Sequence, residues 1–388
     1  MRAHLSTRWL GLGWAALAGA VLWWQVLPHT DTVSVSFPGY WLVARELLSG
    51  TPAISLYDPA YLLPRFEAHG FPGDRMFGPP TLALTLAPLA WLPHDAAREA
   101  WLIGVLWPLL MASLAWLLWP LRAGGLLLGA AIAMSQPVAA NMAVGQTYPL
   151  MLALHCMALS GWRRGHAGWS AVGLSPMLAL RGWYGLLPAA GWVLRGRPAG
   201  LLAAVAGTLV IIAATMPVLG VASWWHFLTV QVPSAGGDAA MVLAYQTWRS
   251  FSLHLGTHHP TFSPDPPLPG LGTAMWLGGS LLLGAVSLWA ARRAGAREAA
   301  FGLWVALSLL LAPVAEDHHM LLTAIPMAIL WRQGARAPVL LAGLLLWPAW
   351  AYDQPALIGG WRSILGYPRL AGVLVLWAAS ARACRALP

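Results

Sequence analysis

The chain has 388 residues, of which 59% are apolar and only 9% are charged, and its formal net charge is +9. A soluble protein carries roughly 25% charged residues, whereas apolar stretches of about 18 or more residues recur throughout this chain, so the composition excludes an ordinary soluble enzyme and predicts an all-α polytopic membrane protein. All 22 basic residues are Arg in small clusters between apolar runs, which indicates membrane topology and no nucleic-acid partner.

The N-terminal segment 1–28 places Arg2 and Arg8 before an apolar run that ends in Trp23 and Trp24. The run is about 20 residues long, which exceeds a usual signal-peptide core, and no small-residue cleavage site follows it. We therefore expect a retained first membrane span with an interfacial aromatic belt.

Arginine clusters at 2–8, 122, 163–164, 195–197, 292–297, 332–336 and 382–385 should mark the cytoplasmic side. Twelve spans place all of these clusters and both termini inside, and short spans allow a count of 10 to 13. The expected spans are 8–27, 98–119, 124–140, 148–162, 167–180, 183–194, 200–220, 270–291, 299–314, 318–331, 338–351 and 368–383. The whole chain, 1–388, is then one integral membrane domain.

The first outer loop, about 28–97, contains two apolar segments that do not fit a span. The stretch 37–62 begins with a sequence that suits an amphipathic interfacial helix, which Gly50 ends. Asp58, before Pro59, is then a turn former. Residues 79–93 are interrupted by prolines and reach only about 20 Å as a helix, against a bilayer core of about 30 Å. We expect this second segment to be re-entrant or interfacial.

Three polar residues in the outer loops are candidates for the chemistry. Asp31 suits a general base that takes a proton from an incoming hydroxyl, although an ordinary loop or cap role is the alternative. Gln146 lies at a predicted outer helix junction, where its amide could bind a sugar hydroxyl or satisfy backbone groups. Arg181 breaks the cytoplasmic pattern of arginines, which suits a phosphate ligand or an ion pair with an outer acid.

A second long outer loop, about 221–269, contains Gln246 and Arg249 together with several histidines. His258 and His259 are adjacent, and adjacent histidines rarely chelate one ion together, so we expect no metal site. Cys156 and Cys384 lie in or beside predicted helices and imply neither a disulfide framework nor a metal knuckle.

Four consecutive ionisable residues, Glu316, Asp317, His318 and His319, stand between two apolar runs. Charged groups in apolar surroundings are costly and usually line a site or a water-filled cavity. Topology places this cluster at an outer turn, where it could orient a substrate, bind a phosphate or transfer a proton. A solvated hairpin turn is the alternative.

Five segments taken together resemble one family, the polyprenol-phosphate-sugar-dependent glycosyltransferases of family 87. In chain order they are "YWLVARELLSGTPAISLYDP", "FGPPTLALTLAPLAWLPHDAAREAW", "SQPVAANMAVGQTYPLMLAL", "YQTWRSFSLHL" and "LLAPVAEDHHMLLTAIP". The resemblance implies the C-type glycosyltransferase fold and a metal-independent, inverting transfer without a cofactor. The donor would be a polyprenyl-phosphate sugar, and the acceptor a glycan or glycolipid at the outer face of a bacterial plasma membrane.

The resemblance also implies residue roles. An acid in the first outer loop would be the base, but the family position four residues before Tyr40 is Ser36 here, so Asp31 is the candidate. Arg181 stands where the family usually has Lys, and Tyr148 stands where it often has Asn. Catalysis would then rest on Asp31 and His318. The candidate substrate ligands are Tyr40, Gln146, Arg181, Gln246, Arg249, Glu316, Asp317 and His319.

Two other functions remain open at this point. A transporter of lipid or sugar would place charges near the bilayer midplane and usually show repeated halves, and no such repeat is visible. A catalytically altered family member acting as a scaffold would fit the missing acid at Ser36.

Overall fold

The structure is a computed structural model that describes residues 7–30, 36–73, 76, 78–234, 243–256, 270–294, 298–349 and 364–385. Across these ranges the chain is helical and forms no strand, as the long apolar runs predict. The candidate base Asp31, together with His258 and His259, lies outside the described residues.

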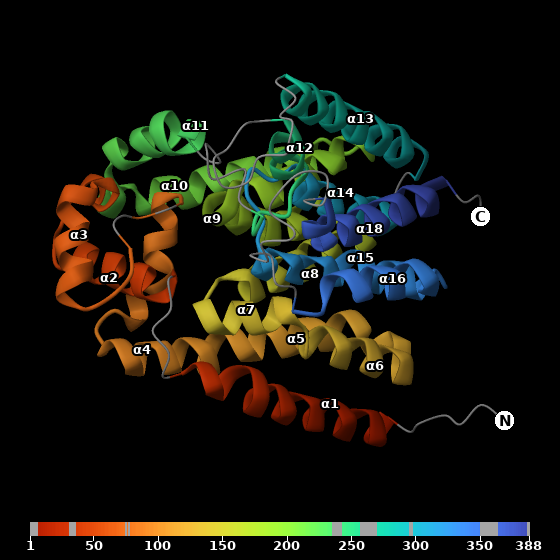
Figure 1. Cartoon of the computed structure of the whole chain (residues 1–388), viewed down its shortest axis with the longest axis horizontal. Coiled ribbons are helices and arrows are strands. Elements are labelled where there is room, and N and C mark those ends of the chain that lie inside the picture. Colours follow the sequence, from red (N-terminus) through yellow and green to blue (C-terminus); the bar gives the residue numbers. More distant parts are fainter. Residues whose placement is uncertain are drawn as a thin grey trace.

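Helices follow one another closely along the chain (Figure 1). The first half comprises α1 Thr7–Val21, η1 Leu22–Val26, η2 Leu27–His29, α2 Ser36–Leu48, η3 Ala53–Tyr57, α3 Pro59–Ala68, η4 Pro80–Leu89, α4 His94–Trp101, η5 Leu102–Leu106, α5 Trp107–Leu118, η6 Trp119–Leu121, α6 Arg122–Ala133, α7 Gln136–Val144, α8 Tyr148–Arg164 and α9 Ala167–Leu194. The second half comprises α10 Ala199–His226, η7 Phe227–Gln231, α11 Val232–Ser234, α12 Trp248–Gly256, α13 Leu271–Ala294, α14 Glu298–Leu311, η9 Asp317–Thr323, α15 Ala324–Arg332, α16 Arg336–Leu346 and α18 Pro368–Arg385.

Four helical stretches of the described chain are long and apolar enough to cross a bilayer: Thr7–His29, His94–Ala133, Ala199–Ser234 and Leu271–Ala294. The pair α7 and α8, bent by 120°, passes the same test as a broken span. Large apolar side chains such as Leu209 on α10 and Leu281 on α13 are exposed. Contiguous exposed apolar surface is typical of a lipid-facing helix, so the chain is a membrane protein.

Helix α9 is two short arms joined at a sharp kink. Arg181, at the kink, has non-helical dihedral angles (φ −153°, ψ 56°). Trp192 Nε1 donates to Ser170 Oγ at 3.1 Å, although the two residues are 22 positions apart, so the arms lie antiparallel. The arms correspond to the spans expected at 167–180 and 183–194, and the loop expected between them is reduced to the kink.

The first outer loop folds into short helices beside the bundle. Helix α2 ends at Leu48, before Gly50 with its φ of 93°, and Asp58 caps α3 by accepting from the backbone N–H of Ala60 at 2.9 Å. The proline-interrupted segment forms the 3₁₀ helix η4, which packs against α2, α9 and α10. These residues therefore form a helical cap, drawn in red and orange at the left of Figure 1.

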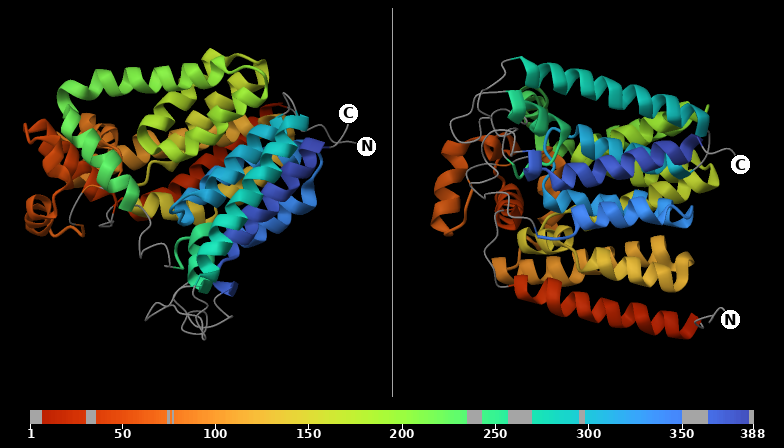
Figure 2. Two further views of the ribbon diagram at one scale, coloured as in Figure 1. Left: turned by 90° about the horizontal axis from the view of Figure 1, so that it is seen from above. Right: turned by 45° about the vertical axis from the view of Figure 1, so that its right-hand side comes forward.

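Polar contacts gather at the two opposite ends of the helix bundle. At one end, called the arginine end here, Glu298 pairs with Arg163 (2.8 Å) and Arg332, and Arg195 donates to the carbonyl of Trp162 at 2.6 Å. Helices α8, α14 and α15 each run between this end and the opposite one, where residues 146–148, 181 and 316–319 lie. Helix α1 begins and α18 ends on the same side of the molecule (Figure 2).

The expected long loop at 221–269 needs correction. Helix α10 continues past a kink at Gly220 (φ 69°) to His226, the helix carries on through η7 and α11 to Ser234, and α12 covers Trp248–Gly256. Residues 221–232 are apolar and aromatic, and their exposed side chains suit a membrane surface better than a solvated loop.

Candidate active site at the α9 kink

The site is built around the backbone break in α9. A kink in a helix frees carbonyl groups from the i to i−4 ladder, and these need other partners. Thr81, which is buried in η4, donates its hydroxyl to the carbonyl of Ala179 just before the kink. The proline-interrupted segment thereby fixes the position of the kink at Arg181.

Arg181 reaches across to the first outer loop and to the junction between α7 and α8. Its Nη2 donates to Tyr40 Oη at 2.7 Å and to Gln146 Oε1 at 3.1 Å. Tyr40 Oη also donates to Gln146 Oε1 at 2.7 Å, and Gln146 Nε2 donates to Ser36 Oγ at 2.9 Å. Three residues expected to be substrate ligands therefore share one hydrogen-bond network, with Ser36 at its edge.

The charge of Arg181 is not neutralised within this network. No carboxylate among the described residues forms an ion pair with it, and its Nε is buried without a hydrogen-bond partner. Its guanidinium carbon lies 5.7 Å from the ring centroid of Tyr148. A guanidinium held only by neutral groups away from water favours a bound anion, and guanidinium geometry matches phosphate well.

Gly145 sets the position of Gln146. It has a φ of 67°, the left-handed conformation that closes helix α7, and Trp101 Nε1 donates to its carbonyl at 3.0 Å. A Cβ at this position would lie 2.7 Å from Cβ of Phe37 on α2. Only glycine allows α2 to approach the junction this closely, and this approach brings Ser36 and Gln146 together.

The ionisable turn before η9 forms the opposite wall. The backbone N–H of Glu316 donates to His319 Nδ1 at 3.0 Å. Because Nδ1 accepts this bond, the proton of the neutral ring is on Nε2, which makes His319 a hydrogen-bond donor. His318 Nδ1 lies 3.6 Å from Glu316 Oε2, and both imidazole rings are buried.

Two tyrosines connect this wall to Arg181. The ring centroid of Tyr148 lies 5.2 Å from that of His318 and 4.4 Å from that of His319. Tyr184, on the second arm of α9, lies 5.7 Å from His319 and donates to the carbonyl of Val314 at 3.2 Å. Sequence reasoning named Tyr148 only as a departure from the family pattern and missed Tyr184, which looks like an ordinary aromatic residue of a membrane helix.

Two carboxyl groups of this wall, those of Glu316 and Asp317, lie within the described residues. Burial, and secondly the neighbouring Asp317, raise the pKa of Glu316 above its ordinary value, while Arg181 opposes the change. A raised carboxyl pKa brings the group closer to neutral pH, where it is better matched to proton transfer.

Asp317 and Gln246 are engaged in a second network. Arg369, fully buried on α18, donates from Nε to Asp317 Oδ1 at 2.7 Å and from Nη2 to Asp317 Oδ2 at 3.1 Å. Gln246 Oε1 accepts from the backbone N–H of Arg369 at 3.1 Å, and the backbone N–H of Gln246 donates to the carbonyl of Ala315 at 2.7 Å. These contacts give both residues a positioning role, and direct substrate binding by either stays a prediction.

Other predicted and missed residues lie around the site. Arg249, on α12, has its guanidinium carbon 5.0 Å from the ring centroid of Trp276, so its expected role with substrate stays a prediction. Sequence reasoning missed Arg98, which is buried and donates to the carbonyls of His29 (2.8 Å) and Ala143 (2.9 Å). Arg98 thereby ties the start of the first outer loop to the end of α7. The role of Asp31 also stays a prediction.

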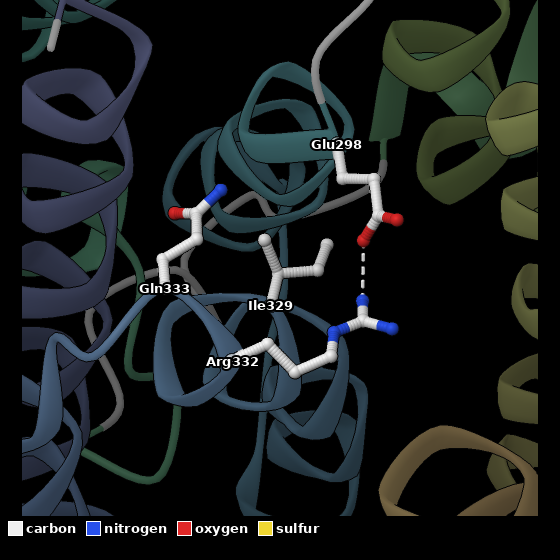
Figure 3. Close-up of a pocket in the computed structure, with 4 residues that line it drawn as sticks. All are labelled: Glu298, Ile329, Arg332 and Gln333. Carbon is white, nitrogen blue, oxygen red and sulfur yellow. Dashed lines mark hydrogen bonds and ion pairs between the residues drawn. The ribbon is translucent and has the colours of Figure 1, made fainter. Parts of the chain in front are cut away.

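A pocket at the arginine end is separate from this site. Glu298, Ile329, Arg332 and Gln333 line it (Figure 3). The Glu298 carboxylate already pairs with Arg332 and Arg163, which makes it less suited to proton transfer. Among the described residues, no group of three or more His, Cys, Asp or Glu is placed to hold a metal ion.

Comparison with known proteins decides the family. The model of glycosyltransferase family 87 matches residues 77–316, which include Gln146, Arg181 and Glu316. This chain belongs to glycosyltransferase family 87. In this family 87 protein, the matched range begins after Ser36 and Tyr40 and ends before His318 and His319. No curated protein and no solved structure gave a match.

Proposed function

We propose that the chain is an inverting hexosyltransferase of the bacterial plasma membrane, with twelve spans in the C-type glycosyltransferase arrangement. It would transfer a mannose-like hexose from a polyprenyl-phosphate sugar to a glycan or glycolipid acceptor on the extracytoplasmic face. Family membership supports sugar transfer, and the arginine distribution supports the orientation.

One observation carries this proposal: among the described residues, the groups that accept hydrogen bonds from the Arg181 guanidinium are neutral. Arg181 donates to a phenol and an amide, and its Nε–H remains without an acceptor. The phosphate of a polyprenyl-phosphate sugar would supply the missing negative charge. Phosphate is also the leaving group, so its charge grows in the transition state, and fixed donors aimed at developing charge are effective catalysts.

The proposed reaction is a single displacement at the anomeric carbon. A carboxylate takes the proton of the acceptor hydroxyl, the acceptor oxygen forms a bond to the anomeric carbon, and the bond to the phosphate oxygen breaks. Arg181 and the Nε2–H of His319 would stabilise the departing phosphate, with His318 beside them. Tyr40 and Gln146 would position the sugar or the acceptor.

The carboxylate has two candidates. Asp31 is favoured because the family resemblance places an acid in the first outer loop, and it stands five residues before Ser36 in the chain. Glu316 is the second candidate because it lies next to His318 and its pKa is raised.

The test is a transfer assay with the purified full chain in detergent and a panel of polyprenyl-phosphate sugars. We expect one hexose donor to support transfer with inversion of the anomeric configuration. Asp31→Asn should abolish transfer while donor binding persists, and Glu316→Gln should retain transfer. Loss of transfer in Glu316→Gln alone would assign the base to Glu316, and donor binding without transfer for every sugar would favour the scaffold function.

A further inference from the structure

Two arginines at the arginine end share one aromatic ring. The guanidinium carbons of Arg293 on α13 and of Arg385 on α18 each lie 4.0 Å from the ring centroid of Trp289. The two cations are therefore no further apart than twice that distance. The ends of α13 and α18 lie side by side in Figures 1 and 2, and Trp377 Nε1 donates to Ser287 Oγ at 2.8 Å between them.

Among the described residues, the donors of this cluster have no acceptor. Within the described ranges, Arg293, Arg385 and the indole N–H of Trp289 make no hydrogen bond or ion pair. The carboxylate described at this end is Glu298, which pairs with Arg332 (Figure 3) and also with Arg163. The other described carboxylates lie on or beside α2, α3, α4 and η9, at the opposite end.

The guanidiniums of Arg293 and Arg385 carry like charges and repel each other, and contact with the same Trp289 ring keeps them close together. A cation near an aromatic face gains about 0.5–1 kcal/mol at an exposed site, which holds each guanidinium in place without neutralising it. An anion that accepts from both guanidiniums would remove the repulsion and satisfy several donors at once.

The surroundings indicate that this anion is carried by a lipid. Leu282 is exposed on α13 and lies seven residues, about two turns, before Trp289, so the two apolar side chains share one face of the helix. A phospholipid would place its acyl chain on this face and its phosphate at the ring. Basic residues at a membrane surface attract anionic headgroups.

We propose that Arg293, Trp289 and Arg385 bind the headgroup of an anionic phospholipid. The test uses the purified full chain in mild detergent with phosphatidylcholine, into which phosphatidylglycerol is titrated. Native mass spectrometry measures retained lipid, and thermal unfolding measures stabilisation. Arg292→Gln/Arg382→Gln, which removes exposed arginines from the same two helix ends, is the matched control for Arg293→Gln/Arg385→Gln.

We expect the Arg293→Gln/Arg385→Gln variant to bind phosphatidylglycerol roughly 30-fold more weakly than the wild type, since both guanidiniums at the Trp289 ring would contact the headgroup, whereas Arg292 and Arg382 would not. The control should lose much less, and Trp289→Leu should weaken binding by removing the shared platform. An equal loss in the control would overturn the proposal in favour of a diffuse basic surface. Equal stabilisation by inorganic phosphate alone would overturn the assignment to a lipid.

Discussion

At the scale of single residues, Arg181 and Glu316 lie on opposite walls of one candidate site. Arg181 is held by Tyr40 and Gln146, and the rings of Tyr148 and Tyr184 lie between it and the histidines. The sequence could predict Arg181 because it is out of place among the arginine clusters. The sequence gives no comparable indication for the two tyrosines, because aromatic residues are common in membrane helices.

The raised pKa of Glu316 predicts a pH dependence if this carboxyl takes part in transfer. The group must be ionised to accept a proton, and below its raised pKa it is protonated, so activity should rise with pH through a value above the ordinary 4.5. The measurement is the pH profile of kcat/KM for wild type and Glu316→Gln. A rising acidic limb that is the same in both proteins would exclude Glu316 as its source.

Gly145 gives a prediction about geometry. Gly145→Ala must adopt a left-handed conformation at a cost of roughly 1–2 kcal/mol, and its Cβ would meet Phe37. We expect transfer to fall roughly 100-fold, because small misplacement of binding groups has effects of that order. Gly19→Ala is the control, since a Cβ there meets no atom within 4 Å. Equal activity of both variants would show that the α7–α8 junction tolerates displacement.

At the scale of elements, the pair of Asp317, which is partly buried, and Arg369, which is fully buried, joins η9 to α18. Arg369 also donates to the carbonyls of Leu346 (2.7 Å) and Pro348 (2.8 Å), so it connects the end of α16 as well. The two residues are 52 positions apart. No local pattern identifies a partner at such a distance, so this ion pair was not predictable from the sequence, and substrate binding by Asp317 stays a prediction.

Removing one member of this pair should be costly. Arg369→Gln leaves the Asp317 carboxylate without its cation, and breaking a buried pair destabilises by about 3–5 kcal/mol. The double variant Asp317→Asn/Arg369→Gln should recover part of the loss, as measured by thermal unfolding in detergent. Arg382→Gln, an exposed arginine of the same helix, is the control. A single variant as stable as this control would refute the positioning role.

Local patterns predicted the short elements well. The end of α2 near Gly50 and the capping turn at Asp58 follow from backbone freedom and side-chain capping, which depend on neighbouring residues only. The kink of α9 was expected as a loop, because the sequence gives no indication that Thr81 would satisfy the freed carbonyl of Ala179.

At the scale of the whole molecule, the described arginines of the arginine end and the candidate site lie at opposite ends of the bundle. Regular spacing of basic clusters predicted this separation, because each span reverses the direction of the chain. The extent of the loop at 221–269 was wrong because the helix does not end near Gly220 but continues past a kink there to Ser234.

Cysteine labelling tests the orientation of these two ends. Glu67→Cys, in the helical cap, should react with a membrane-impermeant maleimide in intact bacteria, whereas Gln333→Cys at the arginine end should react only after lysis. Both positions are exposed, and the native Cys156 and Cys384 are buried, so background labelling should be low. The reverse pattern would place the site on the cytoplasmic face.

The central claim is that Arg181 binds the phosphate of a lipid-linked donor. The most direct measurement compares the affinity of the purified chain for polyprenyl phosphate with its affinity for the corresponding polyprenol, in wild type, Arg181→Gln and Arg181→Lys. We predict that the wild type prefers the phosphate by at least roughly tenfold, that Arg181→Gln loses this preference, and that Arg181→Lys keeps much of it. Equal affinity of the wild type for both lipids, or an unchanged preference in Arg181→Gln, would contradict the account.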